Sequence, residues 1–261
     1  MPYAAMKSKI TLMRNASKKY SQILGALINP RGYSIYSKEF YLYHRLSFSQ
    51  EGEDLVLSRI FDGQERGFYV DVGAHHPQRF SNTYLFYLKG WRGINIDAMP
   101  GSMEPFEKIR PRDLNLEMAI SDREEVLTYY EFDEPALNGF SAELSKEYEE
   151  ISNHRIIATK EIKTRTLANV LENYLEFGSA IDFLSVDAEG LDYEVLKSND
   201  WSRFRPKAIV AEELTREDTS REPRVSDFLV ANDYCFYSKL MNSFIFLDNN
   251  FLKIRSSKND F

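Results

Sequence analysis

Cysteine is nearly absent from the 261 residues, since Cys235 is the only one. A single cysteine cannot form an intrachain disulfide, and the chain has no cysteine cluster that could bind zinc. Because Cys235 lies in an apolar run, the sequence predicts a core position for it. Long hydrophobic runs are absent too: none approaches the roughly 18 to 20 residues of a membrane span, and the N-terminal apolar stretches are too short for a secretory signal. We therefore expect a cytoplasmic protein.

Lysine and arginine are also fewer than aspartate and glutamate, except at one end of the chain. The formal net charge is −7, which argues against a general nucleic-acid-binding protein. Residues 1–45 nevertheless carry eight lysines and arginines against one acid, Glu39. The simplest interpretation of this basic N-terminal extension is a solvated segment. The alternative is a peripheral contact with an anionic membrane or an acidic protein partner.

Glycine is scarce where a dinucleotide-binding site would need it. The β-rich run at residues 68–72 stops at Gly73, where a residue without Cβ allows a sharp turn and the close approach of a ligand. Residues 74–77, Ala-His-His-Pro, supply no further glycine, whereas dinucleotide folds need several to bring backbone N–H groups onto a pyrophosphate. The pattern favours an adenosyl ligand that carries an amino acid in place of phosphates, with Asp71 facing its positive charge.

An acid follows the next predicted strand. Residues 93–96 are typical of a buried parallel strand, and Asp97 lies at its carboxyl edge. An acid just over twenty residues past the turn is placed to accept hydrogen bonds from a ribose diol. Between the two strands, residues 81–83 are a plausible N-cap cluster for a helix at residues 84–89. The alternative is an ordinary βαβ unit with a glycine turn and no ligand.

Helix and strand patterns alternate along the rest of the chain and favour a single α/β domain over residues 46–261. The alternation closes on a hairpin, which predicts a mostly parallel sheet with one reversed strand. Residues 133–160 are polar without strand periodicity and are predicted to form a lid or insertion. The further predicted strands are 115–120, 126–132, 181–186, 207–211, 234–239 and 242–247, and the further helices start at 49–50, 103, 167, 193 and 225.

Taken together, these segments resemble the FkbM family of S-adenosylmethionine-dependent methyltransferases. The matching strings are SQEGED at 49–54, YVDVGA at 69–74, SNT at 81–83, INIDA at 94–98, AISD at 119–122, SVDAEG at 185–190 and NSFIF at 242–246. The resemblance covers about residues 48–248. It implies a Rossmann-like methyltransferase fold, with a mostly parallel sheet of seven strands, a C-terminal antiparallel hairpin and helices on both faces. It also implies methyl transfer to hydroxyls of sugars and natural products.

The resemblance implies S-adenosyl-L-methionine as cofactor and places its contacts beyond the carboxyl ends of strands. The implied contacts are Asp71, Gly73 and Ala74 at the methionine end, Asp97 at the ribose, Ser121 and Asp122 at the adenine, and Asn82 and Ala98 elsewhere around the cofactor.

Three carboxylates end two central strands. Asp187 follows one strand, and Glu212 and Glu213 follow the next. Because these edges lie side by side in a parallel sheet, the carboxylates should converge and raise one another's pKa. A Mg²⁺ ion bound by Asp187, Glu212 and Glu213 would relieve the repulsion and could hold an acceptor's hydroxyls.

Two observations keep this metal site open to another interpretation. The layout is similar to that of metal-dependent O-methyltransferases, but those families usually have Lys or His three residues past the first acid, where this chain has Gly190. Glu213 could instead pair with Arg216 or Arg224 at the surface. Without a metal, either a side chain accepts the proton of the acceptor's hydroxyl or simple proximity suffices.

The predicted catalytic residues are Asp187, Glu189 and His76, with His75 as an alternative to His76. The expected activity is O-methyl transfer to a hydroxyl of a sugar, glycan or related small molecule.

Two other functions fit parts of the sequence. Tyr193 and Lys197 have the Tyr-x-x-x-Lys spacing of NAD(P)-dependent short-chain reductases, which places both groups on one helix face. A non-catalytic, nucleoside-binding member of the fold is the second alternative.

Overall fold

The computed structural model describes residues 45–176, 179–213 and 224–257. The chain divides into two units, Met1–Leu46 and Ser47–Phe261, and the second unit contains every element described below. The predicted basic extension therefore lies outside the described residues, apart from Arg45.

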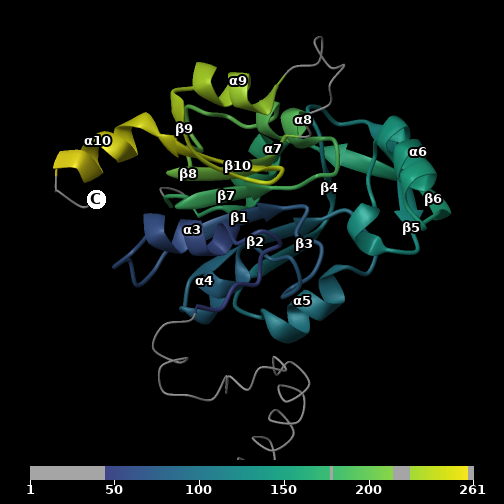
Figure 1. The fold of residues 1–261 in the computed structure, drawn as a ribbon, viewed down its shortest axis with the longest axis horizontal. Coiled ribbons are helices and arrows are strands. Elements are labelled where there is room, and N and C mark those ends of the chain that lie inside the picture. The colour runs from purple at the N-terminus through teal and green to yellow at the C-terminus, as the bar shows by residue number, and fades with distance from the viewer. Residues whose placement is uncertain (1–44, 177–178, 214–223, 258–261) are drawn as a thin grey trace, which may run out of the picture. The chain divides into compact units, whose positions relative to one another are not determined.

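A seven-stranded sheet forms the centre of the second unit (Figure 1), with strand order β3-β2-β1-β7-β8-β10-β9. Strand β10 runs antiparallel to both of its neighbours, and the other described pairs in this sheet are parallel. The predicted seven strands with one reversed strand in a C-terminal hairpin are confirmed. The strands are β1 Phe68–Val72, β2 Arg92–Asp97, β3 Leu114–Glu117, β7 Phe183–Val186, β8 Ala208–Glu212, β9 Tyr234–Leu240 and β10 Ser243–Asp248.

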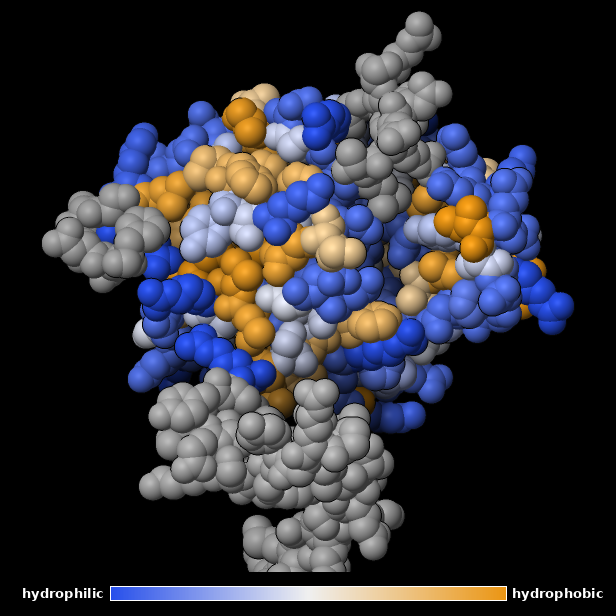
Figure 2. Space-filling view, in the orientation of Figure 1, coloured by the Kyte–Doolittle hydropathy of each residue, from blue (hydrophilic) through white to orange (hydrophobic). Residues whose placement is uncertain are grey.

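Helices cover both faces of this sheet because alternate strand residues point to opposite sides. Val70 and Leu184 belong to a core shared with α7, α8 and α9, whereas their neighbours Tyr69 and Phe183 pack with α3 and α4. In the space-filling view, hydrophobic residues gather over the middle of the visible face and hydrophilic residues surround them (Figure 2). The helices are α3 Glu53–Ile60, α4 Tyr84–Leu88, α5 Met103–Ile109, α7 Leu167–Tyr174, α8 Asp192–Lys197, α9 Val225–Ala231 and α10 Asn249–Ser257.

A smaller sheet, with order β4-β6-β5, lies beside the large one (Figure 1). It comprises β4 Ala119–Ile120, β5 Val126–Phe132 and β6 Ile156–Arg165, and between β5 and β6 come a short 3-10 helix, η1 Pro135–Leu137, and α6 Ala142–Ile151. The sequence pattern missed β6 because most of its residues are exposed and polar on both faces. The predicted polar insertion is thus largely ordered as helix and strand.

The predicted third strand, residues 115–120, is wrong as a single element. Met118 still donates its backbone N–H to the carbonyl of Asp97 at 2.9 Å, but the chain then leaves the large sheet. Ala119 and Ile120 pair with β6 instead. This break moves the end of the third strand toward the cleft described next.

Within the described ranges, no helix is both long and apolar enough to span a lipid bilayer.

Candidate active site

The turn after β1 depends on glycine because the chain itself approaches closely there. Gly73 has φ +80°, and a Cβ at this position would lie 1.7 Å from the backbone oxygen of Asp187. No larger residue fits without separating the ends of β1 and β7. The turn therefore brings Asp187 against the end of β1, whereas the sequence predicts a sharp turn and the close approach of a ligand there.

A cleft opens at the carboxyl ends of β1, β2 and β7. Its walls come from the Gly73 turn, the end of β2, the β3–β4 junction, and residues 135–136 and 138–140 of the inserted segment. Of the predicted site residues, those that line the cleft are Gly73, Asp97, Ala98, Asp187 and Glu189.

Asp97 is held in this cleft by two backbone donors. Its Oδ2 accepts from His75 N and its Oδ1 from Met99 N, both at 2.8 Å. Burial raises the pKa of Asp97, and the two N–H groups oppose that shift. Each carboxylate oxygen retains capacity for another hydrogen bond, so the arrangement suits a vicinal diol.

The two adjacent histidines have different positions. His75 has a left-handed backbone with φ 51° and lines the cleft, and its buried Nε2 has no hydrogen-bond partner. Burial, followed by the Arg79 guanidinium, lowers the pKa of His75. His76 lies outside the cleft, and its Nδ1 accepts from the backbone N–H of Gln78 and Arg79 at 3.1 and 2.9 Å. The structure therefore brings His75, and not the predicted His76, into the site.

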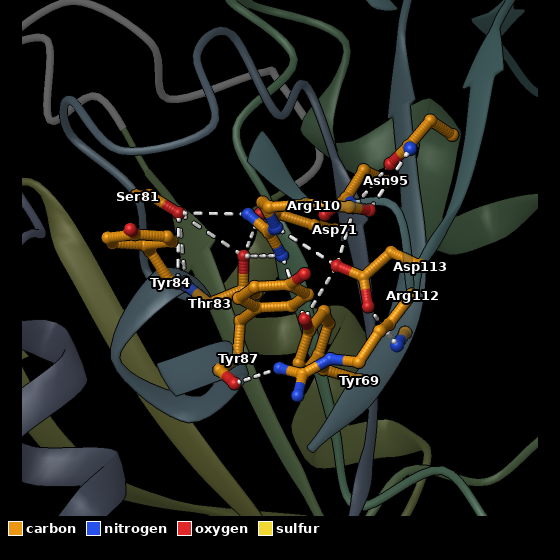
Figure 3. Close-up of polar contacts among 12 residues, drawn as sticks. Tyr69, Asp71, Ser81, Thr83, Tyr84, Tyr87, Asn95, Arg110, Arg112 and Asp113 are labelled. Atoms are coloured by element: carbon orange, nitrogen blue, oxygen red, sulfur yellow. Dashed lines mark hydrogen bonds and ion pairs between the residues drawn. The ribbon is translucent and has the colours of Figure 1, made fainter. Parts of the chain in front are cut away.

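Asp71 lies beneath the turn and does not line the cleft. Its Oδ2 accepts from Thr83 Oγ1 at 2.7 Å, and Thr83 Oγ1 accepts from Arg110 Nη2 at 2.9 Å (Figure 3). Ala74 also turns away from the cleft, and packs against Met103 of α5. Asp71 and Ala74 are predicted to contact the methionine end of the cofactor, but neither residue lines the cleft.

Arg110 joins this network to the neighbouring strands. Its side chain is 0% exposed, and its Nε donates to Asp113 Oδ2 at 2.9 Å. Tyr69 OH donates to the same oxygen at 2.7 Å and accepts from Arg110 at 2.9 Å (Figure 3). The Arg110 guanidinium thus compensates two buried carboxylates. It donates directly to Asp113, and it is linked to Asp71 through the hydroxyl of Thr83. No local pattern in the sequence predicts the role of Arg110, because an arginine at the end of a short helix is ordinarily a surface residue.

The predicted adenine contacts are displaced along the chain. Met118, Ala119 and Ile120 line the cleft, whereas Ser121 and Asp122 do not. Asp122 Oδ2 instead accepts from Lys197 Nζ at 2.9 Å. The displacement follows from the break at Met118, which turns the residues before Ser121 toward the cavity.

Asp187, Glu189 and Glu212 form an acidic group at the ends of β7 and β8. Burial, reinforced by Glu212, raises the pKa of Asp187 well above its ordinary range, and burial followed by Asp187 does the same for Glu189. Burial, followed by other acids, raises the pKa of Glu212 to about 8. Tyr148 OH donates to Glu189 Oε2 at 3.0 Å, but the buried Asp187 Oδ1 has no hydrogen-bond partner. The predicted convergence of Asp187 and Glu212 is therefore seen.

Glu213 does not join this group, which corrects the predicted trio. Its Oε1 accepts from Arg224 Nη2 at 2.6 Å, and its Oε2 accepts from Ser226 N at 2.7 Å. Adjacent residues of an extended strand point to opposite faces, so Glu212 and Glu213 cannot both join the acidic group. Over the described ranges, no group of three or more His, Cys, Asp or Glu residues is arranged to bind a metal ion.

A second, smaller cavity adjoins the cleft. The two cavities share Gln50, Phe80 and Asp187. Asn82, a predicted cofactor residue, lines this second cavity and donates to Ser185 Oγ at 3.2 Å. Asp187 thus lies at the junction between the cleft and the second cavity.

The Tyr-x-x-x-Lys spacing has a structural explanation. Lys197 pairs with Asp122, and the ring of Tyr193 packs against Phe228 at a centroid distance of 5.5 Å. Neither Tyr193 nor Lys197 lines the cleft. The reductase alternative therefore lacks a catalytic pair at the site.

The family model described as the methyltransferase FkbM domain matches residues 71–237. No curated relative matches the chain. Three similar solved structures are a Pyrococcus horikoshii protein proposed to be an RNA methyltransferase, monomeric WbdD, and precorrin-6y C5,15-methyltransferase from Geobacter metallireducens.

Their similarity to this chain is remote. The identities are 11%, 11% and 12%, and the TM-scores are 0.38, 0.42 and 0.38. The matches cover 76%, 83% and 84% of this chain, and 83%, 45% and 94% of the respective structures. At these TM-scores the structural matches add no argument beyond the family match.

Proposed function

Because the chain belongs to the FkbM methyltransferase family, we propose that it transfers a methyl group from S-adenosylmethionine to a hydroxyl of a sugar, glycan or related small molecule. The observation that carries the proposal is Asp97, a buried carboxylate that lines the cleft at the carboxyl end of β2 and whose two oxygens each accept one backbone hydrogen bond and can accept another. An acid in this place is suited to a ribose.

The residues of the cleft fit the proposed cofactor. Asp97 would hold the ribose hydroxyls, and the apolar side chains of Met118, Ile120 and Tyr129 would enclose the adenine. His75 Nε2, buried without a partner, is available to a polar group of the ligand. When bound, S-adenosylmethionine would supply an electrophilic methyl group on a sulfonium.

Asp187 is the residue we propose as proton acceptor for the acceptor hydroxyl. It lies where the two cavities meet, and its Oδ1 has no other partner. Its raised pKa brings the carboxyl closer to the value at which a general base is effective near neutral pH. Glu189 is the second candidate, although one of its oxygens already accepts from Tyr148.

Binding measurements test the cofactor and separate the alternatives. We expect calorimetry to detect binding of S-adenosylhomocysteine and no binding of NAD. Incubation with methyl-labelled S-adenosylmethionine and a panel of sugars, glycans and sugar nucleotides should then transfer label to a hydroxyl. Binding of NAD alone would support the reductase, and binding of S-adenosylhomocysteine without transfer to any acceptor would support a non-catalytic member.

Chelation separates base catalysis from the Mg²⁺ alternative. Asp187 and Glu212 still converge, so two of the predicted metal ligands remain in place. With Asp187 as the base, excess chelator should leave transfer unchanged. Loss of transfer that added Mg²⁺ restores, with cofactor binding intact, would assign the pair to a metal ion.

A further inference from the structure

We propose that His75 recognises the methionine end of the cofactor by donating a hydrogen bond from Nε2 to the carboxylate of that end. The proposal rests on the proposed methyltransferase function and assigns a binding residue within its cofactor site.

The turn after β1 has no backbone donor to spare for a carboxylate. Glycine-rich turns bind anions through backbone N–H groups that point at the ligand. Here, Pro77 has no N–H, and every other backbone N–H of residues 73–79 already donates to an acceptor. The acceptors are the carbonyls of Ile96 and Ala74, the carboxylate of Asp97 and Nδ1 of His76. A carboxylate bound at this turn would therefore need a side-chain donor.

Such donors are few among the described residues that line the cleft. These residues include no Lys or Arg, and the side chains other than acids that can donate are Gln50, His75, Tyr129 and Asn138. Asn138 already donates to Met99 Sδ at 3.3 Å, and Tyr129 belongs to the wall that we assign to the adenine. Gln50 is exposed, whereas His75 Nε2 is buried and has no hydrogen-bond partner. His75 is therefore the donor that most needs a ligand.

His75 is held between the two ends of the path that the methionine chain would follow. Its backbone N–H donates to Asp97, the carboxylate that we assign to the ribose. Its ring stacks on Phe80 at a centroid distance of 6.3 Å and an interplanar angle of 20°. Phe80 lines both the cleft and the second cavity. Since the methionine chain is attached to the ribose and must bring the methyl group to the junction, it would pass this imidazole.

The chemistry of the ring suits a carboxylate. Burial, followed by the Arg79 guanidinium, lowers the pKa of His75, so the ring is neutral near neutral pH and carries one N–H. A ligand carboxylate would favour the tautomer with hydrogen on Nε2 and would accept a charge-assisted hydrogen bond. Arg79 does not line the cleft, and its Nη1 donates to Glu134 Oε1 at 2.9 Å.

Two ligands that differ only in the carboxylate test the proposal: S-adenosylhomocysteine and its decarboxylated analogue, which keeps the adenosine, the sulfur and the amine. Calorimetry at neutral pH measures both dissociation constants. We expect the unmodified protein to prefer S-adenosylhomocysteine by about ten- to a hundredfold, the usual contribution of a hydrogen bond to a charged group. His75→Phe keeps a ring against Phe80 and removes Nε2. It should lose most of that preference and retain its affinity for the analogue. His75→Gln, which restores an amide donor, should recover part of the preference.

Two control variants locate the effect. His76→Asn changes the adjacent histidine, which lies outside the cleft, and keeps an oxygen acceptor for the backbone N–H groups that Nδ1 binds. Arg79→Gln removes the neighbouring cation. Both variants should retain the preference for S-adenosylhomocysteine.

Nitrogen NMR of the histidine rings gives a readout in the unmodified protein, should His75→Phe not fold. The Nε2 signal that is absent from His75→Gln and present in His76→Asn belongs to His75. This signal should shift when S-adenosylhomocysteine is added and stay nearly in place when the analogue is added. A signal that responds equally to both ligands would contradict a contact with the carboxylate.

The proposal also fails if the unmodified protein binds the two ligands equally tightly, or if His75→Phe keeps the preference. It fails as well if His76→Asn, Arg79→Gln or a Gln50→Ala variant loses the preference as completely as His75→Phe. Failure of the proposed function is a different result, namely that neither ligand binds the unmodified protein.

Discussion

The two cavities that meet at Asp187 differ in how their carboxylates are held. In the cleft, Asp97 accepts two backbone hydrogen bonds, and these favour its charged form. At the junction with the second cavity, Asp187 Oδ1 has no hydrogen-bond partner, and burial, followed by the neighbouring acids Glu212 and Asp192, raises the pKa of Asp187. Both carboxylates are withdrawn from water, but only Asp97 is compensated by the fold.

This difference indicates two kinds of chemistry. A carboxylate fixed by backbone donors has a defined position and charge, which suits binding of a ligand diol. A group of close acids without compensating cations can hold and release protons near neutral pH, which suits proton transfer. The predictions below test this contrast, from the largest expected effect to the smallest.

Replacement of the uncompensated acid should affect the reaction and not the cofactor. We expect Asp187→Asn to lower the rate of methyl transfer by roughly 10²–10⁴, the usual contribution of a positioned base, with the dissociation constant of S-adenosylhomocysteine nearly unchanged. Single-turnover kinetics and calorimetry measure the two quantities. Glu213→Gln is the matched control and should retain the rate. If the Asp187→Asn enzyme remained active, the proton acceptor would be Glu189 or His75 instead.

Removal of Arg110 should destabilise the folded protein, because Asp71 and Asp113 would remain buried without a cation. We expect Arg110→Met to lower the free energy of unfolding by about 3–5 kcal/mol, measured by urea denaturation. If this variant does not fold, Thr83→Val removes one link and should cost about 1–3 kcal/mol. Arg123→Met, at an exposed arginine, should have almost no effect. Equal stability of the Arg110 and Arg123 variants would contradict a structural role for the network.

Replacement of the compensated acid should affect the cofactor first. Asp97→Ala removes hydrogen bonds to a carboxylate that contribute roughly 1.5–3 kcal/mol each, so affinity for S-adenosylmethionine should fall about ten- to a hundredfold or more. Calorimetry measures it. Asp122→Ala is the control, since Asp122 pairs with Lys197 outside the cleft. If only the control loses affinity, Asp97 does not bind the cofactor, and both the sequence prediction and the cleft assignment for Asp97 are wrong.

Stability should depend on pH through Glu212 of the acidic group and through its neighbour Asp192. The folded pKa values, about 8 for Glu212 and about 7 for Asp192, lie above the ordinary carboxyl range. The stability that their protonated forms contribute is therefore complete at acidic pH and is lost as pH rises through 7 and 8, by up to about 1.4 kcal/mol per pH unit for each group. The melting temperature of the ligand-free protein should fall from pH 6 to pH 9. Glu212→Gln should flatten that fall, and an identical slope would show that Glu212 titrates in its ordinary range.

Much of the fold was readable from local patterns. The run before Gly73, the strand that ends at Asp97 and the C-terminal hairpin carry periodicities and turn residues that act over a few positions. The cleft at the carboxyl ends of strands followed from the parallel sheet. Strand β6 was missed because its polar, exposed residues pair through backbone hydrogen bonds that the side-chain pattern does not reveal.

The sequence by itself determined the sheet and its reversed strand, and it put Asp97 and Asp187 at strand ends, because these follow from hydrophobic periodicity and chain order. Only the tertiary structure decided which polar side chains face the cavities. The left-handed backbone of His75 places this histidine, and not His76, in the cleft. The side chain of Glu213 pairs with Arg224 outside the acidic group. The tertiary structure also buried Arg110 between Asp71 and Asp113. Such choices depend on backbone direction at single residues and on partners distant in the chain, and neither leaves a local pattern in the sequence.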